Sequence, residues 1–229
     1  MTGNLADGWE GQRTIAQGAE AVLEEGRFLG RPAVLKLRRP KGYRHPDLET
    51  SIRTNRTRAE ARALRDARAA GVRTPAVLDA DPREGRLVLE LVEGPTVRAA
   101  LDGLPGVDRE RVARALGGAL GALHAAGMVH GDPTTSNFVL ERLEEGVPVM
   151  LAVLDISLGG RADGVEERGV DLRLLSEAFG STHHVHGDLI DAVYEGYAEA
   201  FPEGAGEALD RMDEIASRGR YVSRKERTG

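Results

Sequence analysis

The first ninety residues alternate between short apolar stretches and turn residues, a pattern typical of a β-sheet. Residues 11–21 and 33–37 are predicted to form strands around turns, and residues 86–91 a further strand. Residues 55–70 are predicted to form a helix that ends at Gly71. The apolar positions of this helix fall on one side and are Ala59, Ala63, Leu64, Ala67 and Ala70. The front of the chain is therefore expected to be a sheet with one main helix.

The second half of the chain shows helical periodicity interrupted by one short apolar run. Asp108 is predicted to cap a helix that ends at Gly127. Residues 149–154 are typical of a short buried strand, and the pattern from Val170 onward is helical. The buried stripe of the first helix is predicted to be Val112, Leu116, Leu120 and Leu123. This half is therefore expected to be mostly helical.

The change of pattern near residues 93–94 predicts an α+β molecule with two unlike lobes. We expect an N-terminal lobe of residues 1–93, a C-terminal lobe of residues 94–217 and a basic tail of residues 218–229. No apolar run approaches the roughly 20 residues of a membrane span, and the N-terminus does not resemble a secretory signal. The chain has no cysteine, which excludes disulfides, thiolate metal sites and a cysteine nucleophile. A cytoplasmic location fits this composition.

The charge of the chain is unevenly distributed. The formal net charge is −6, yet residues 36–68 carry a net charge of +7 and residues 218–229 one of +4. We call residues 36–68 the basic island. Two basic segments on an acidic body favour a polyanionic partner. The alternative is an arginine-rich helix face in solvent and a frayed tail. We expect the tail to contact nucleic acid and not to fold, because it has little apolar content to bury.

The chemistry concentrates between residues 130 and 155. Asp132 precedes Asn137 by five residues in the stretch HGDPTTSN, and an apolar run then ends at Asp155. In phosphoryl transfer, an Asp orients the attacking hydroxyl, while an Asn and a second Asp hold Mg²⁺. The pattern therefore predicts Asp132 as the catalytic residue and Asn137 and Asp155 as Mg²⁺ ligands. A polar turn between a helix and a hairpin is the alternative.

Upstream residues can complete a site for ATP. Lys36 ends the stretch AVLK, which matches the strand lysine that grips nucleotide phosphates, and Glu60 is its natural counter-ion. Alternatively, Lys36 lies on the surface and Glu60 caps a helix in a box with Thr57. Two further segments are assigned by position as nucleotide-binding. They are the reduced phosphate loop Gln17, Gly18 and Ala19, and the hinge residues Glu90 and Val92, whose backbone can contact adenine.

Four stretches resemble the PRPK-type kinase, the small atypical kinase subunit of the KEOPS complex. They are QGAEA at 17–21, PKGYRHP at 40–46, RTRAEAR at 56–62 and HGDPTTSN at 130–137. The resemblance implies a two-lobed, protein-kinase-like fold that lacks the usual substrate-docking segments. It implies a role in forming threonylcarbamoyladenosine on tRNA. The implied partners are a transferase subunit on the C-terminal lobe and a small regulatory subunit on the N-terminal lobe, with tRNA along the basic island and tail.

The chain departs from the general kinase pattern at several positions. Ser157 stands where kinases have the glycine of Asp-Phe-Gly, so we expect a fixed metal-binding strand end. Only 15 residues separate Asp155 from Val170, too few for a long activation segment. Asp171 either stabilises the catalytic loop or caps a helix.

Five aromatic or histidine positions have less specific interpretations. Trp9 is expected to pack on the first sheet, and His130 to be structural and not a base. His183, His184 and His186 resemble a metal cluster, although loop packing is the simpler interpretation.

Three functions fit these residues. The first is an ATP-dependent phosphotransferase or ATPase of the non-specific serine/threonine kinase class, acting on tRNA modification. The second is a small-molecule phosphotransferase of the aminoglycoside-kinase type, which needs a helical substrate-holding insertion that this chain has no room for. The third is a nucleotide-binding scaffold without turnover, which would not need Lys36, Glu60, Asp132, Asn137 and Asp155 together.

Overall fold

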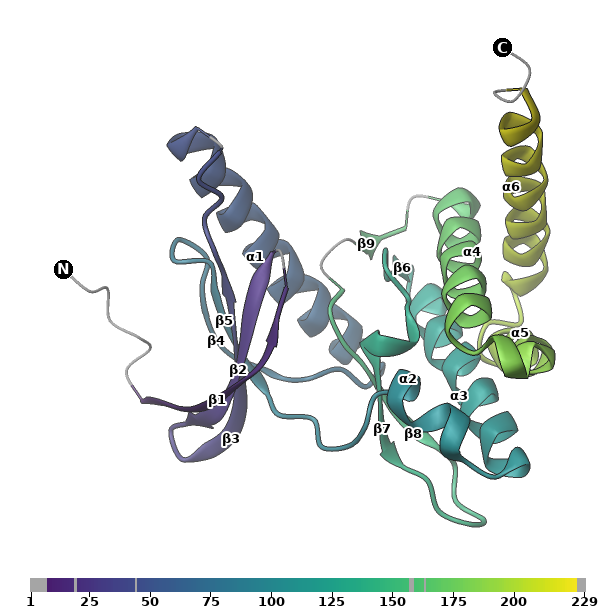
Figure 1. The fold of residues 1–229 in the computed structure, drawn as a ribbon, viewed down its shortest axis with the longest axis horizontal. Helices are drawn as coiled ribbons and strands as arrows, with labels where there is room; N and C mark the ends of the chain where they lie inside the picture. The colour runs from purple at the N-terminus through teal and green to yellow at the C-terminus, as the bar shows by residue number, and fades with distance from the viewer. Residues whose placement is uncertain (1–7, 19, 44, 157–158, 163, 226–229) are drawn as a thin grey trace.

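The structure is a computed structural model. It describes the chain except residues 1–7, 19, 44, 157–158, 163 and 226–229. Figure 1 shows two lobes of different composition, with a sheet and one long helix in the N-terminal lobe and mostly helices in the C-terminal lobe. The predicted α+β architecture is confirmed. No helix among the described residues is long and apolar enough to cross a membrane.

The N-terminal lobe is built on a five-stranded antiparallel sheet in the order β1-β2-β3-β5-β4. Of these strands, β2 and β4 were not predicted, because polar residues break their apolar pattern. Trp9 lies beside a small core cluster of Ala33, Leu35 and Val88, as expected. The strands are β1 (Trp9–Gln17), β2 (Ala21–Phe28), β3 (Arg31–Arg38), β4 (Val77–Asp81) and β5 (Arg86–Glu90).

The long helix α1 spans Pro46–Ala69, so the predicted start at residue 55 is wrong. The helix begins at Pro46 because proline suits the first helical turn. Its first turns hold only two large apolar residues, Leu48 and Ile52, and this short pattern did not mark the start. The capping-box interpretation of Thr57 is also wrong, since Thr57 lies mid-helix and its hydroxyl donates to the carbonyl of Arg53 at 2.9 Å. Of the predicted apolar face, Ala63, Leu64 and Ala67 are buried, whereas Ala59 and Ala70 are exposed.

The C-terminal lobe packs its helices around α3 (Gly106–Ala125). The predicted stripe of Val112, Leu116, Leu120 and Leu123 is buried, while Asp108 lies in the first turn and is not the cap. Gly117 of α3 faces the carbonyl of Val193 so closely that a Cβ there would collide with it. The other elements are α2 (Val97–Ala100), η1 (Leu101–Gly103), β6 (Met128–Val129), η2 (Thr135–Asn137), β7 (Phe138–Arg142), β8 (Met150–Val153), β9 (Gly160–Arg161), α4 (Val165–Thr182), η3 (His184–Leu189), α5 (Ile190–Ala200) and α6 (Ala205–Lys225).

The C-terminal segment differs from its prediction. Helix α6 continues through Lys225, so the expectation that residues 218–229 do not fold is wrong for residues 218–225. The helix packs beside α4 through its earlier turns, where Ala205, Ala208 and Met212 are buried (Figure 1). Propagating an existing helix costs far less than nucleating a new one, so a polar segment extends a helix that its apolar neighbours stabilise.

Candidate active site

The catalytic loop of residues 130–134 follows β6 and is held in place by Asp171 from α4. The Asp171 carboxylate accepts hydrogen bonds from the backbone amides of His130 at 2.6 Å and Gly131 at 2.8 Å. It also lies 3.1 Å from Nε2 of buried His124. Asp171 is inside α4 and fully buried, so the interpretation as a helix cap is wrong and the stabilising role is confirmed.

His130 is a structural residue of this loop, as expected. Its ring is fully buried, and its Nδ1 accepts a hydrogen bond from the amide of Asp132 at 3.3 Å. Burial lowers the pKa of His130, although the charges of Asp171, Asp132 and Asp155 oppose this shift. The three carboxylates are thus close enough to act on one imidazole, which stays neutral.

Asn137 contacts Asp132 directly. Its side-chain amide nitrogen donates to the Asp132 backbone oxygen at 2.8 Å and to Oδ2 at 3.2 Å. Because this nitrogen faces Asp132, the amide oxygen of Asn137 points away from Asp132, and this oxygen is a hydrogen-bond acceptor. The carbonyl of Asn137 accepts from the amide of Leu154 at 2.8 Å, which ties η2 to the segment that carries Asp155.

Asp155 follows β8 in an unusual backbone conformation. Its φ is +52°, in the left-handed region that costs a non-glycine residue roughly 1–3 kcal/mol. The next residue, Ile156, is fully buried. The side chain of Asp155 is 40% exposed, and its Oδ1 lies 2.8 Å from the Lys36 ammonium of the other lobe. A strained carboxylate anchored by a buried neighbour is typical of a functional position.

Lys36 stands between two carboxylates, one from each lobe. Its Nζ is 2.8 Å from Oε1 of Glu60 on α1 as well as from Asp155. The predicted Lys36–Glu60 pair is confirmed, and the alternative of a surface lysine and a helix cap is wrong. Sequence reasoning missed Arg38, whose Nη2 lies 2.6 Å from Oε2 of Glu60. Arg38 is two residues after Lys36 on the same strand, and this spacing places both side chains on one face of the sheet.

The turn between β1 and β2 carries the proposed phosphate loop. Gln17 ends β1 and is exposed, and the amide of Gly18 donates to the carbonyl of Ala21 at 2.9 Å. Ala19 lies outside the described residues. Glu20 ties this turn to α1, because its Oε1 accepts from Arg56 at 2.6 Å. The structure therefore shows a tight turn at the edge of the sheet and not a long glycine-rich flap.

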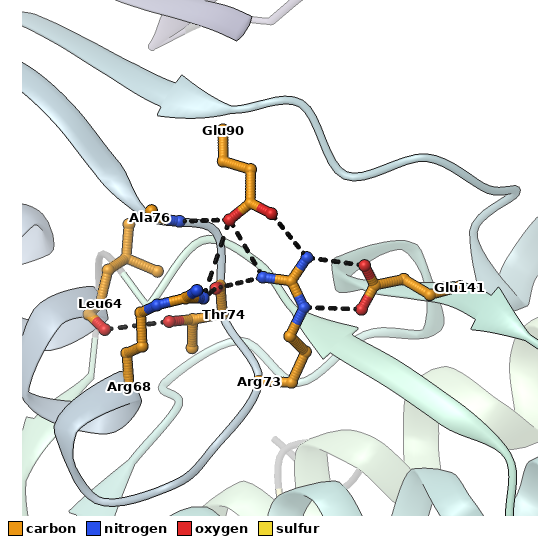
Figure 2. A network of polar contacts seen from close by, with 7 residues as sticks. All are labelled: Leu64, Arg68, Arg73, Thr74, Ala76, Glu90 and Glu141. Carbon is orange, nitrogen blue, oxygen red and sulfur yellow. Dashed lines mark hydrogen bonds and ion pairs between the residues drawn. The ribbon is translucent and has the colours of Figure 1, made fainter. Parts of the chain in front are cut away.

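Glu90 lies at the end of β5, where the hinge was predicted, and its side chain belongs to a polar network (Figure 2). Arg73, in the loop after α1, donates to Glu90 with Nη2 at 2.8 Å and to Glu141 of β7 with Nη2 at 2.6 Å. Its backbone oxygen accepts from Val153 of β8 at 2.8 Å. Hydrogen bonds to Glu141 and Glu90 raise the pKa of Arg73, and the bond from Arg73 lowers that of Glu90. Sequence reasoning missed this contact between the lobes.

The histidine group does not form a metal site among the described residues. His183 is buried, and its ring nitrogens lie 2.6 Å from Asp102 and 3.2 Å from the hydroxyl of Thr135. His184 is exposed and His186 partly so. Loop packing is the correct interpretation of His183, which braces the start of η2.

Comparison with solved structures and protein families defines the class of this chain. Residues 12–192 match the phosphotransferase enzyme family. A Rio2 kinase in an ADP/Mg²⁺-phosphoaspartate complex from Chaetomium thermophilum has the same fold, with a TM-score of 0.64, 14% identity, and coverage of 94% of this chain and 73% of that one. The fold is that of protein-kinase-like phosphotransferases, as predicted.

Two curated relatives assign the chain to a more specific family. The KEOPS complex subunit Bud32 of Pyrococcus abyssi is 38% identical over 220 residues, which cover 93% of this chain and 97% of the relative. A probable bifunctional tRNA threonylcarbamoyladenosine biosynthesis protein of Methanothermobacter thermautotrophicus is 39% identical over 209 residues, or 91% of this chain and 36% of the relative. The chain spans about a third of the length of such bifunctional relatives. It belongs to the Bud32 family of kinase-like phosphotransferases.

Proposed function

We propose that this chain is the ATP- and Mg²⁺-dependent kinase or ATPase subunit of a KEOPS-type complex, supporting threonylcarbamoyladenosine formation on tRNA. One observation carries the catalytic part of the proposal. Lys36 joins Glu60 of the N-terminal lobe to Asp155 of the C-terminal lobe, each at 2.8 Å. The residue before Asp155, Leu154, donates its backbone amide to the carbonyl of Asn137, the partner of Asp132. The names of the Bud32 and bifunctional relatives support the tRNA part.

The residues at the site fit Mg²⁺ and ATP. Magnesium prefers oxygen ligands, and the carboxylate of Asp155 and the amide oxygen of Asn137 supply them. When bound, the metal neutralises charge on the phosphate oxygens during transfer. Lys36, which pairs with Glu60 and Asp155, supplies a cation for the nucleotide phosphates. We expect Asp155 to exchange part of its contact with Lys36 for the metal when Mg-ATP enters.

The chain's own residues position the reaction. Asp132 orients the attacking hydroxyl or water and accepts its proton, while Asn137 fixes the Asp132 carboxylate by a hydrogen bond at 3.2 Å. Asp171 holds the loop backbone so that this geometry is formed before the substrate binds. In this assignment residues 1–93 grip the nucleotide, and residues 94–217 carry the catalytic and metal-binding groups.

Adenine is proposed to lie against the hinge. The Glu90 amide already donates to the carbonyl of Ala76 at 2.9 Å. The proposed contacts are therefore the backbone carbonyl of Glu90 and the amide of Val92. Gln17, Gly18 and Ala19 are proposed to cover the phosphates from the β1–β2 turn.

The proposed partners follow from charge and from the relatives. We propose that the transferase subunit binds the C-terminal lobe and a small regulatory subunit the N-terminal lobe. Transfer RNA is proposed to follow the basic island, with its net charge of +7, and the basic end of α6. A cytoplasmic location, where unmodified tRNA is present, belongs to the same proposal.

The Asp155→Ala substitution tests the metal assignment. We expect it to abolish Mg-ATP hydrolysis by the full chain while circular dichroism shows an unchanged fold, because the Asp155 side chain is 40% exposed and Lys36 keeps Glu60 as a partner. Asp210→Ala is the matched control, since Asp210 is exposed on α6. Normal turnover in Asp155→Ala would overturn the assignment of Asp155 as a metal ligand.

A further inference from the structure

A second cationic site lies beside the nucleotide site, between the end of β3 and the first half of α1. It is a small pocket with five cationic side chains and two carboxylates on its walls, a net charge of +3. Neither the catalytic loop nor the metal-binding residues contribute to it. The pocket is lined by Glu20, Arg38, Arg39, Lys41, Glu49, Ile52, Arg53 and Arg56. We call it the arginine pocket.

Arg38 brings an incompletely paired charge into this pocket. Its side chain is 6% exposed, and only Nη2 is paired, with Glu60 at 2.6 Å. The Nε and Nη1 atoms of Arg38 are buried and have no hydrogen-bond partner among the residues that the structure describes. A guanidinium cannot lose its proton to escape burial, so its donors need acceptors. Glu60 cannot supply more, because its other oxygen is occupied by Lys36.

Arg53 is held in position, and its Nε donor has no hydrogen-bond partner among the described residues. Its Nη1 donates to the carbonyl of Glu84 at 3.1 Å. Its side chain crosses Gly85 so closely that a Cβ there would lie 2.6 Å from Cδ of Arg53. The Nε atom of Arg53 is buried without a hydrogen-bond partner among the described residues. The arginine is therefore fixed before any ligand arrives, which reduces the entropy lost on binding.

The carboxylates on the wall do not neutralise the pocket. Glu20 accepts a hydrogen bond from Arg56 at 2.6 Å, and this bond lowers the pKa of Glu20, which keeps it ionised. The other carboxylate, Glu49, is buried on α1. Arg39 and Lys41 stand at the mouth on the segment that follows β3. The unmatched groups are all donors, so the missing ligand must be an acceptor that carries negative charge.

We infer that the arginine pocket binds a phosphate oxyanion, and that this phosphate belongs to the backbone of tRNA. Phosphate offers several acceptor oxygens in the geometry that guanidinium groups pair with. The pocket lies within the basic island, whose cations continue along α1 after Arg56 at Arg58, Arg62, Arg65 and Arg68. A free anion needs no such surroundings, whereas a polyanion gains from each further cation. The choice of tRNA as the source rests on the proposed function.

Inorganic phosphate tests the pocket without tRNA or nucleotide. Thermal unfolding of the full chain is compared in sodium phosphate and in sodium chloride of equal ionic strength, without Mg²⁺ or ATP. We expect phosphate to raise the unfolding midpoint of the wild type and of Arg58→Gln, because Arg58 is exposed on the same helix but does not line the pocket. Arg53→Gln should lose the rise. An equal rise in Arg53→Gln would place the anion elsewhere and overturn the inference.

Transfer RNA tests the source of the phosphate. The affinity of the full chain for an unmodified tRNA is measured across a salt series, and one lost phosphate contact lowers the salt slope by roughly 0.7–0.9. We expect this change in Arg53→Gln and not in Arg58→Gln. Arg53→Lys, which keeps the charge, serves as the folding control and should restore most of the slope. Equal slopes in the wild type and Arg53→Gln, or equal losses in both glutamine variants, would overturn tRNA as the ligand of this pocket. ATP hydrolysis by the same samples reports separately on the catalytic proposal.

Discussion

Glu60 pairs with two cations at once, so the loss of Glu60 and the loss of one cation affect the cluster differently. Its carboxylate accepts from Lys36 at 2.8 Å and from Arg38 at 2.6 Å, and all three side chains are buried. Loss of Glu60 leaves two buried cations without this acceptor. Loss of Lys36 leaves Glu60 still paired with Arg38.

We therefore predict that Glu60→Ala destabilises the chain more than Lys36→Met does. Removing one partner of a buried ion pair costs about 3–5 kcal/mol, and we expect Glu60→Ala to fall in that range and Lys36→Met clearly below it. Both variants should weaken ATP binding. Urea unfolding and nucleotide titration of the two single variants and the double variant measure these effects.

The outcome depends on coupling between the two residues. Because they share one pair, the effects on ATP binding should be non-additive in a double-mutant cycle. Strictly additive effects, or equal destabilisation by the two single variants, would contradict the shared-carboxylate arrangement.

Spacing in the sequence predicted well which candidate site residues lie together. The order of Asp132, Asn137 and Asp155 is local to one loop and the next strand, so spacing alone brings these residues near each other. Arg38 and Arg73 were missed because arginine is common on surfaces, and nothing near either one in the sequence shows which carboxylate faces it. Their partners Glu60 and Glu141 lie 22 and 68 residues away.

At the scale of elements, Arg73 connects three strands next to the predicted hinge, namely β5, β7 and β8. Its guanidinium lies between Glu90 of β5 and Glu141 of β7 (Figure 2). Its backbone oxygen accepts a hydrogen bond from the amide of Val153 of β8. Strand β8 leads two residues later to Asp155. The placement of the sheet relative to the segment that carries Asp155 is therefore set in part by one guanidinium.

We predict that Arg73→Met lowers the free energy of unfolding at pH 7 by about 1.5–3 kcal/mol, the usual contribution of hydrogen bonds to charged groups. Arg73 lowers the pKa of Glu90 below its ordinary value of 4.5. A lowered carboxyl pKa stabilises the fold above the unfolded-state pKa, and this stabilisation is lost as the pH falls through the folded-state pKa. The difference between wild type and Arg73→Met should thus shrink below about pH 4.5.

Denaturant unfolding between pH 7 and pH 3 measures this difference. Arg83→Met is the matched control, because Arg83 is exposed in the turn between β4 and β5. A difference that stays constant across this range would show that Arg73 contributes by packing and not by its pairing with Glu90.

Elements with an apolar stripe were predicted more accurately than polar ones. The periodicity of α3 located both its ends to within three residues. The first nine residues of α1, from Pro46, include only Leu48 and Ile52 as large apolar residues, and this pair did not mark the start of the helix. The last turns of α6 were missed for the same reason. Tertiary contacts stabilise both helices, and a polar stretch in sequence does not show where such contacts extend a helix.

At the scale of the whole molecule, one apolar cluster runs from Leu64 and Leu89 of the N-terminal lobe to Val153 and Ile156 of the C-terminal lobe, and polar contacts also join the two lobes. Lys36 of β3 contacts Asp155, and Arg73 of the loop after α1 contacts Glu141 of β7. Sequence predicted the two lobes from their different periodicities. It could not predict how they face each other, because that depends on side chains far apart in the chain.

The central claim is that this chain turns over ATP with Asp132 as the catalytic residue. The most direct measurement is Mg-ATP hydrolysis by the wild type and by Asp132→Asn, each alone and with the transferase subunit and tRNA. We predict that the substitution lowers turnover by about 10²–10⁴-fold, the usual contribution of a positioned base. Nucleotide affinity should change little, because Lys36 and the metal ligands hold the phosphates. Equal turnover in both proteins, or none in the wild type under either condition, would contradict the account and leave a nucleotide-binding scaffold.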